Sequence, residues 1–410
     1  MKVQRKPVGF HTSSSDEERS GMYSCGLSNV LLSRASSWAS LVMLLGAFLL
    51  RYFNPTEAQA DPLAPFNVGF QILDLYAKRG QNKQILAVAV WYPTTEAPHE
   101  YNYGGPTRGM VAFDARPDPA GAPYPLFVFS HGYGGSGLSA LFLTEALASR
   151  GWIVACPDHN DAYSAVRIRT GQQGDLDRRG FLSYLRQIAS SGPADRVRYL
   201  YRLEEMQLVL GHMLASESFG PLIDKGKVAV GGHSFGGFTA LGLCGTIPEQ
   251  HDPRIKAVLL FSTGAGSYLF KDEELSAVRM PSMLFMGEKE KGQLRGSKSM
   301  LDLQERIFRN LSPPKYLLVV KGGTHFSFNN RFSQSLGARL MSGSETQFEV
   351  IRRYSMAFLE RHVLGKEEAE AVLRQKDPLI TDYWSEPLGS LGSAVVPLRI
   401  FAGPRSMSAH

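Results

Sequence analysis

The sequence predicts an α/β fold with a mostly parallel sheet, an antiparallel N-terminal edge and helices on both faces. Short runs that are apolar throughout alternate with helical stretches, which is typical of parallel strands covered on both sides. Two β-rich runs, "VGFQILDLY" (68–76) and "QILAVAVWYP" (84–93), are joined by the turn-rich "AKRGQN" and predict the antiparallel edge. Finally, "GHSFG" (232–236) joins an apolar run to a helical one, which indicates a sharp strand-to-helix turn.

The other elements follow from apolar runs and helical periodicity. The further strands are expected at "PLFVFS" (125–130), "WIVAC" (152–156), "KVAVG" (227–231), "IKAVLLFS" (255–262), "SMLFMG" (282–287) and "KYLLVV" (315–320). The helices are expected at 138–151, 195–215, 235–245, 298–310 and 345–365. Residues 94–124 are rich in Pro and Gly and predict an irregular connection, and the tail beyond Gly365 is expected to be loosely held.

The N-terminus has the pattern of an export signal. "WASLVMLLGAFLL" (38–50) has no charge but is too short for a comfortable membrane span. "AQA" precedes Asp61 and supplies the small residues that a signal peptidase requires. We therefore expect cleavage after Ala60 and a secreted or periplasmic protein; the alternative is a protein anchored in the membrane by residues 38–50.

This reading divides the chain into three parts. Residues 1–60 are a signal peptide with a long polar leader, residues 61–364 an α/β catalytic domain, and residues 365–410 a C-terminal extension. Within the domain, residues 158–193 form a polar insertion, which is a candidate lid because insertions this long are commonly functional or mobile.

Composition and charge limit the classes of molecule that we expect the protein to bind. The 410 residues carry a formal charge of +6, without a dense Lys/Arg stripe interleaved with aromatic residues, so we expect no nucleic-acid partner. Cys156 and Cys244 lie in apolar runs and are expected to be buried free thiols, with a disulfide as the alternative. Neither has the spacing of a metal site, and no metal or organic cofactor is expected. Oligomeric state stays open.

The glycine-flanked serine is the strongest chemical signal. "GHSFG" is a G-x-S-x-G motif that lies after a predicted strand and before a predicted helix. A turn this sharp leaves no room for side chains at Gly232 and Gly236, and it exposes the Ser234 hydroxyl above the sheet edge. We therefore predict Ser234 as a nucleophile.

A serine hydroxyl needs a base, and the base needs an acid to orient it. His325 in "KGGTHFSF" follows the strand at 315–320 and lies at the same sheet edge, so it is the predicted base. Chain order places the acid between the two, and the strand "SMLFMG" runs into "EKEKG". After the end of a strand, the chain needs two or three residues before a side chain can point back at the site. This favours Glu290 as the acid, and Glu288 is the alternative.

The loop "HGYGG" (131–135) is the predicted second half of an oxyanion hole. Its small residues let backbone N–H groups approach a substrate oxygen, and we expect the amides of Tyr133 and Phe235 to be the donors. His131 is interpreted as a structural hydrogen-bonding residue, with a catalytic role as the alternative.

Taken together, "SHGYGGSGLSALFLTEALASRGWIVACPDH", "GGHSFGG" and "GGTHFSF" resemble the α/β-hydrolase superfamily. The likeness is strongest to the branch of platelet-activating-factor acetylhydrolase-like and dienelactone hydrolase-like proteins, with cutinases nearby, and covers about residues 66–362. The resemblance also implies Ser234 as the nucleophile and His325 as the base. It implies the amides of Tyr133 and Phe235 as the oxyanion donors. In the acetylhydrolase group it implies an Asp acid after the earlier strand, where this chain has Ser262 and Thr263. Dienelactone hydrolases use a Cys nucleophile, so a dienelactone substrate is disfavoured.

The expected function is that of a serine carboxylic-ester hydrolase that forms an acyl-enzyme and acts on short-chain or lipid-type esters. Its partner is a small-molecule ester, and contact with a lipid or membrane surface is compatible with the sequence. The alternative is an inactive α/β-hydrolase that binds a hydrophobic ligand or a protein partner.

Overall fold

A computed structural model describes residues 65–79, 82–164, 167–168, 177–263, 268–292, 299–332 and 342–388. The predicted signal peptide, its cleavage site at Ala60, Cys25, and residues 389–410 lie outside the described residues. Within the described part, no helix has both the length and the apolar character that crossing a membrane requires.

An 11-stranded sheet forms the centre of the described chain, in the order β11-β10-β9-β8-β7-β5-β6-β2-β1-β4-β3. Six central strands, β6 to β10 along this order, are mutually parallel. The strands are β1 (Asn67–Arg79), β2 (Asn82–Thr94), β3 (His99–Gly104), β4 (Thr107–Phe113), β5 (Tyr124–Ser130), β6 (Ile153–Pro157), β7 (Ile223–His233), β8 (Ile255–Phe261), β9 (Ser282–Gly287), β10 (Lys315–Val320) and β11 (Ile380–Glu386).

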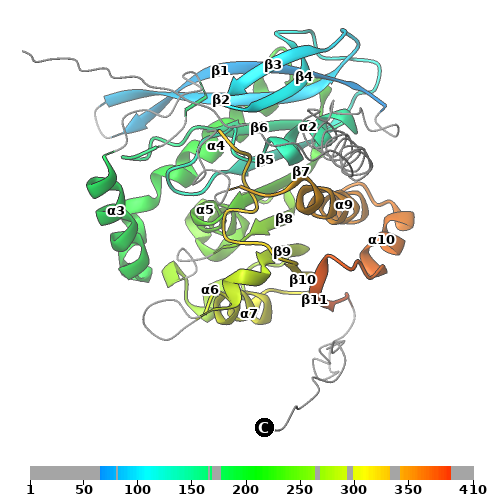
Figure 1. Ribbon diagram of the computed structural model, residues 1–410. Helices are drawn as coiled ribbons and strands as arrows, with labels where there is room; N and C mark the ends of the chain where they lie inside the picture. The colour runs from blue at the N-terminus through cyan, green and yellow to red at the C-terminus, as the bar shows by residue number, and fades with distance from the viewer. Residues whose placement is uncertain are drawn as a thin grey trace, which may run out of the picture. The chain divides into compact units, whose positions relative to one another are not determined.

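Helices cover both faces of the sheet, as predicted. The α-helices are α2 (Leu141–Ser149), α3 (Arg178–Ser190), α4 (Tyr201–Ala215), α5 (Phe235–Leu241), α6 (Asp272–Leu275), α7 (Met300–Asn310), α9 (Glu345–His362) and α10 (Glu370–Arg374). Figure 1 shows α4 and α5 on one side of the sheet and α2 and α9 on the other. Leu203 of α4 and Phe238 of α5 pack into one buried cluster, and Leu143 of α2 and Phe358 of α9 into the second.

The antiparallel N-terminal edge is confirmed, because β1 pairs with β2 from Asn67–Thr94 to Arg79–Asn82. The expectation of an irregular connection at 94–124 is wrong in part. β3 and β4 form a hairpin there, with Gly104 and Gly105 at φ of 127° and 55° in its turn. Glycines that indicated irregular chain instead make the tight turn that a hairpin needs.

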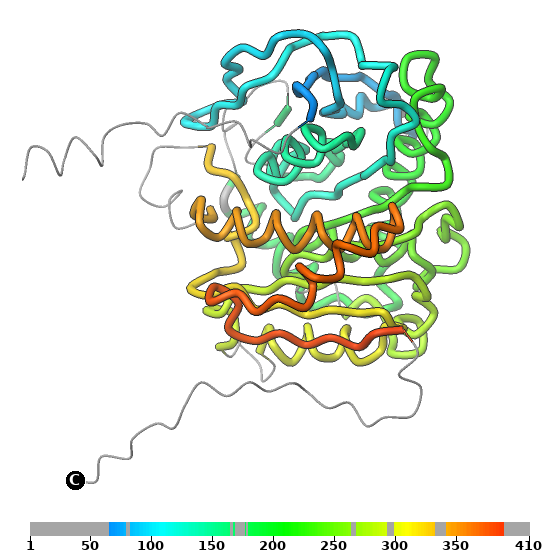
Figure 2. The backbone as a smooth tube through the Cα atoms, turned by 90° about the vertical axis from the view of Figure 1, so that its right-hand side faces the viewer, coloured from blue at the N-terminus to red at the C-terminus, as the bar shows by residue number. Residues whose placement is uncertain are grey.

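The expectation of a loosely held tail beyond Gly365 is also wrong for the described residues. β11 adds an antiparallel strand to β10, and Figure 2 shows this red segment along the lower edge of the sheet. Leu373 of α10 and Ile380 of β11 are buried in the core. Apolar side chains beyond residue 364 therefore contribute to the core.

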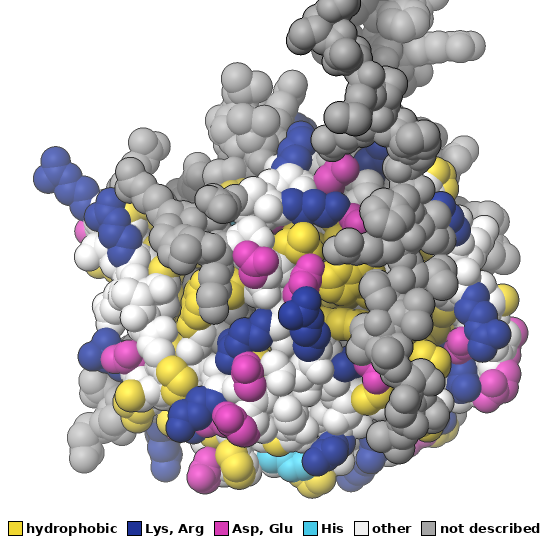
Figure 3. Space-filling view, turned by 90° about the horizontal axis from the view of Figure 1, so that it is seen from below, with side chains coloured by type: hydrophobic (Ala, Val, Ile, Leu, Met, Phe, Trp, Pro, Cys, Tyr) yellow, Lys and Arg dark blue, Asp and Glu magenta, His cyan; other side chains and the backbone are white. Residues whose placement is uncertain are grey.

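Charges of both signs are mixed on the face drawn in Figure 3, where Lys and Arg side chains lie beside Asp and Glu. Both Cys156 and Cys244 are buried free thiols, as expected, and burial raises the pKa of each.

Candidate active site

Ser234 occupies the sharp turn between β7 and α5. Its φ of 52° and ψ of −115° lie where L-residues other than glycine are uncommon, so the turn holds a strained conformation. A Cβ on Gly232 would lie 2.1 Å from the carbonyl oxygen of Gly236, and one on Gly236 would lie 1.9 Å from the Ser130 oxygen. Glycine is therefore required at both positions because there is no room for a Cβ atom, and not because of a positive φ.

The imidazole of His325 lies against the Ser234 hydroxyl. His325 Nε2 is 2.8 Å from Ser234 Oγ, and His325 Nδ1 is 3.1 Å from Glu290 Oε2. When the hydroxyl donates to Nε2, the ring proton is on Nδ1 and faces the carboxylate. The three side chains come from turns after β7, β9 and β10, whose parallel carboxyl ends meet at one sheet edge.

The two candidate acids have different partners. Glu290 lies in the 3₁₀ turn η6 (Glu288–Lys291), where its Oε1 accepts a hydrogen bond of 2.7 Å from the Gly287 amide. Glu288 Oε2 instead accepts a 2.8 Å hydrogen bond from the amide of Gly322, in the turn before His325. The structure brings Glu290, rather than Glu288, to the imidazole.

The loop that follows β5 runs beside Ser234. A Cβ on Gly132 would lie 3.2 Å from the Cβ of Ser234, so only a residue without a side chain fits there comfortably. The next residue is Tyr133, and Phe235 is the first residue of α5 after Ser234. The two amides predicted as oxyanion donors thus belong to segments that both lie next to Ser234.

Known proteins share this architecture. The family model described as "Platelet-activating factor acetylhydrolase, isoform II" matches residues 107–187 and 181–378, well over half of the chain. The chain belongs to this acetylhydrolase family. The match confirms the predicted resemblance, and it extends into the C-terminal helix α10.

Curated relatives of this isoform II family member have low sequence identity to it. Platelet-activating factor acetylhydrolase from Cavia porcellus is 25% identical over 273 residues, which are 60% of this chain and 59% of the relative. The proteins of the same name from Canis lupus familiaris and Bos taurus are 24% and 26% identical, each over 59% of this chain and 58% of their own length. The chain thus matches somewhat more than half the length of these relatives.

A solved structure supports the fold. A ferulic acid esterase from Streptomyces cinnamoneus superposes with a TM-score of 0.57 at 24% identity, covering 75% of this chain and 93% of that one. The likeness establishes the α/β-hydrolase fold for this member of the acetylhydrolase family.

Two residues that contact His325 or Glu290 were not identified as candidate site residues from the sequence of this family member. Ser262 follows β8, and its Oγ lies 2.7 Å from His325 Nδ1 and donates to Glu290 Oε2. His233 precedes Ser234, and its Nε2–H donates a 2.8 Å hydrogen bond to the His325 carbonyl. Burial, together with the nearby His325, lowers the pKa of His233 to about 3, so its ring stays neutral.

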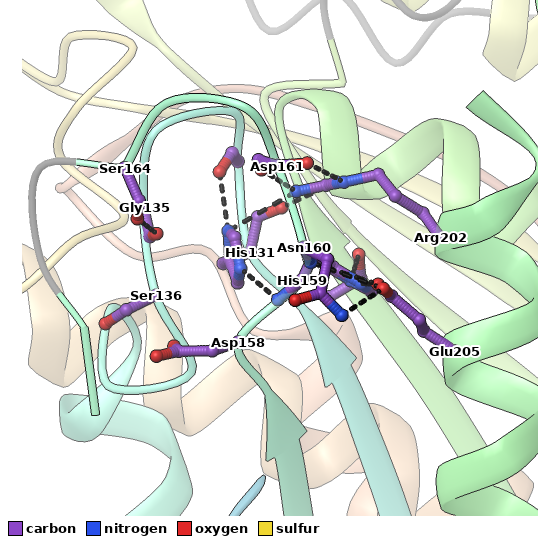
Figure 4. A network of polar contacts seen from close by, with 12 residues as sticks. His131, Gly135, Ser136, Asp158, His159, Asn160, Asp161, Ser164, Arg202 and Glu205 are labelled. Carbon is purple, nitrogen blue, oxygen red and sulfur yellow. Dashed lines mark hydrogen bonds and ion pairs between the residues drawn. The ribbon is translucent and has the colours of Figure 1, made fainter. Parts of the chain in front are cut away.

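A buried polar network supports the His131 end of the loop (Figure 4). Arg202 donates a 3.0 Å hydrogen bond to the His131 carbonyl and pairs with Asp161 at 2.9 Å. The amide of His159 donates to His131 Nε2 at 3.0 Å, which leaves the ring proton on Nδ1 facing the Gly132 carbonyl at 2.7 Å. Burial, with Arg202 nearby, lowers the pKa of the His131 imidazole, so it hydrogen-bonds as a neutral ring. This geometry agrees with the structural interpretation of His131.

Helix α3, part of the predicted insertion at 158–193, packs against the Tyr133 ring. The ring is stacked with Phe181 at 5.3 Å and with Tyr184 at 5.0 Å, both at an interplanar angle of 18°. Ser164 Oγ also donates to the Gly135 carbonyl at 2.6 Å. The described part of the insertion is therefore in contact with the loop beside Ser234.

Among the described residues, no group of three or more His, Cys, Asp or Glu side chains is arranged to hold a metal ion. A cavity of about 260 Å³ lies between β1 and α4, lined by residues that include Tyr76, Tyr201 and Glu205. None of Ser234, His325 and Glu290 lines it.

Proposed function

We propose that this protein is a serine carboxylic-ester hydrolase in which Ser234 is the nucleophile, His325 the base and Glu290 the acid. One observation carries the proposal: His325 Nε2 is 2.8 Å from Ser234 Oγ while its Nδ1 faces Glu290. This geometry has the base within proton-transfer reach of the hydroxyl. Membership of an acetylhydrolase family supports the same chemistry.

The proposed reaction proceeds in two halves. Ser234 Oγ attacks the ester carbonyl carbon as His325 Nε2 takes its proton, and the carbonyl oxygen becomes an oxyanion bound by the Tyr133 and Phe235 amides. The tetrahedral intermediate expels the alcohol, which leaves with the proton from His325. Water then attacks the carbonyl carbon of the acyl-enzyme while His325 takes a proton from it. His325 returns this proton to Ser234 Oγ as the carboxylic acid leaves.

We propose short-chain or lipid-type esters as substrates. The curated relatives are platelet-activating factor acetylhydrolases, and the solved structure is a ferulic acid esterase. The rings of Tyr133, Phe181 and Tyr184 gather beside the proposed oxyanion loop and would give an acyl group an apolar wall. A panel of p-nitrophenyl esters of increasing acyl length, run beside a phospholipid with a short second chain, measures the preference.

The decisive test uses active-site variants with a fluorophosphonate probe. S234A should lose about four to six orders of magnitude of kcat and all labelling, while its unfolding curve stays close to that of the wild type. E290Q should lower kcat by about 10²- to 10⁴-fold, because a neutral amide neither orients nor balances the imidazolium. E288Q is the matched control and should retain most activity. An unlabelled, inactive wild type would favour the alternative of a binding protein.

We also propose that the protein is exported, with cleavage after Ala60. The uncharged run at 38–50 followed by "AQA" supports this proposal. N-terminal sequencing of the protein from its native host should begin at Asp61. A mature protein that retains residues 38–50 would favour the membrane-anchored alternative.

A further inference from the structure

Ser262 is held in an unusual backbone position at the end of β8. It is fully buried, its φ is 45°, and its amide donates a 2.7 Å hydrogen bond to the Phe285 carbonyl of the neighbouring strand. A non-glycine residue rarely adopts this conformation without a reason. The conformation aims the hydroxyl at the junction between His325 and Glu290.

The hydrogen bonds at this junction have one consistent assignment. His325 Nε2 accepts from Ser234, so Nδ1 carries the proton of the neutral ring. That N–H has two acceptors, Ser262 Oγ at 2.7 Å and Glu290 Oε2 at 3.1 Å. The Ser262 proton in turn points to Glu290 Oε2. Each of the two hydrogen bonds made by the serine hydroxyl is therefore shorter than the direct contact between His325 Nδ1 and Glu290 Oε2.

We propose that Ser262 is a positioning residue that links His325 to Glu290 and makes the catalytic group a tetrad. This inference rests on the proposed function, and it assigns Ser262 no bond making or breaking. The hydroxyl accepts from Nδ1–H and donates to the carboxylate. When His325 becomes an imidazolium, the hydrogen bond to Ser262 gains a charged donor, and the polarised hydroxyl donates more strongly to the Glu290 carboxylate.

The test compares loss of this hydroxyl with loss of a neighbouring one. S262A should lower kcat by about 10- to 100-fold with KM changed less than about twofold, since hydrogen bonds to charged groups contribute most when the charge forms. Thr263 is equally buried, and its hydroxyl has no hydrogen-bond partner among the described residues. The control T263V should retain wild-type kcat. S262G, which suits a positive φ, replaces S262A if the latter does not fold.

A carboxylate introduced at position 262 gives an independent test of the same proposal. Ser262 Oγ is closer to Nδ1 than Glu290 Oε2 is, so an Asp side chain there reaches the imidazole, and Asp tolerates this backbone conformation. S262D in an E290Q background should recover at least about tenfold of the kcat lost by E290Q alone. No recovery, together with an S262A kcat within twofold of the wild type, would overturn the proposal.

An NMR measurement separates this inference from the proposed function. The His325 Nδ1–H proton resonance, assigned by its loss in H325Q, is recorded on the full chain without substrate. S262A should shift this resonance and T263V should leave it in place. An unmoved resonance in S262A refutes the Ser262 link whatever the activity. A wild type that hydrolyses no ester refutes the proposed function, even if the resonance moves.

Discussion

The imidazole of His233 donates its Nε2 hydrogen bond to the backbone carbonyl of His325, at 2.8 Å. The residue before Ser234 thus contacts the loop that carries His325, and the centroids of the two rings lie 5.1 Å apart. Because the ring of His233 is buried and neutral, it can hold this tautomer without a competing charge. The segment that carries the His325 side chain is therefore hydrogen-bonded to the residue that precedes Ser234.

Loss of this donor should slow the reaction. We expect H233F to lower kcat by about fivefold, because one hydrogen bond worth about 1 kcal/mol no longer holds the His325 loop. H233Q keeps an N–H donor and should recover most of the activity. Initial rates with a short-chain p-nitrophenyl ester, with thermal unfolding as a check on folding, give the comparison. Equal kcat for H233F and the wild type would contradict the positioning role.

The buried ion pair below the His131 loop makes a prediction about stability. Arg202 and Asp161 are both fully buried, and although burial alone would raise the pKa of Asp161, Arg202 outweighs it and lowers this pKa to about 2. R202M leaves an unpaired buried carboxylate and should cost about 3–5 kcal/mol of unfolding free energy. The double variant D161N/R202M should be more stable than R202M. Urea unfolding at neutral pH measures both, and an R202M as stable as the wild type would show that the pair is dispensable.

Helix α3 should influence the reaction through Tyr133. Phe181 is one of two rings that stack on Tyr133, and such a pair contributes about 0.5–1.5 kcal/mol. We expect F181A to lower kcat/KM for a short-chain ester by about three- to tenfold, because the loop with the Tyr133 amide becomes less ordered. Leu182 is the adjacent exposed residue, so L182A is a control for changes in the helix itself. Similar values for the two variants would mean that the stack does not position the loop.

The fold was largely predictable because parallel strands buried on both faces are continuous apolar runs. The six central strands and the helices at 300–310 and 345–362 lie close to their expected positions. The hairpin of β3 and β4 and the edge strand β11 were not predicted. Both belong to partly exposed edges, where mixed polar sequences resemble loops and only pairing with a neighbouring strand defines the structure.

The candidate site likewise has residues that the sequence indicated and residues that it did not. Ser234, His325 and Glu290 follow from a motif, from chain order and from the length of a turn. Ser262 and His233 act through contacts made by residues 28 to 92 positions apart, and no local pattern encodes such contacts. The signal for Ser262 was its place directly after a strand, where the resemblance to the acetylhydrolase group implies an acid.

A carboxylate far from the triad provides the clearest pH prediction. Glu145 of α2 packs beside Tyr103 and Gly109, and its Oε1 is buried without a hydrogen-bond partner among the described residues. Burial raises the pKa of Glu145 from 4.5 to about 7, and Tyr103 and Arg352 offset only part of this effect. The folded protein therefore holds a proton on Glu145 at pH values where the unfolded chain has released it.

The sign of the stability change follows from this proton. The contribution of Glu145 is fully present below about pH 4.5 and is lost as the pH rises through 7, at a cost on the order of 3 kcal/mol by pH 9. E145Q mimics the protonated form, so it should match the wild type near pH 5 and become more stable than it above pH 7. The exposed Glu349 gives the control E349Q, which should follow the wild type throughout. Urea unfolding at pH 5, 7 and 9 measures the difference between each variant and the wild type, which cancels the other titrating groups. A difference for E145Q that stays constant with pH would mean that this carboxyl releases its proton as readily in the folded protein as in the unfolded chain.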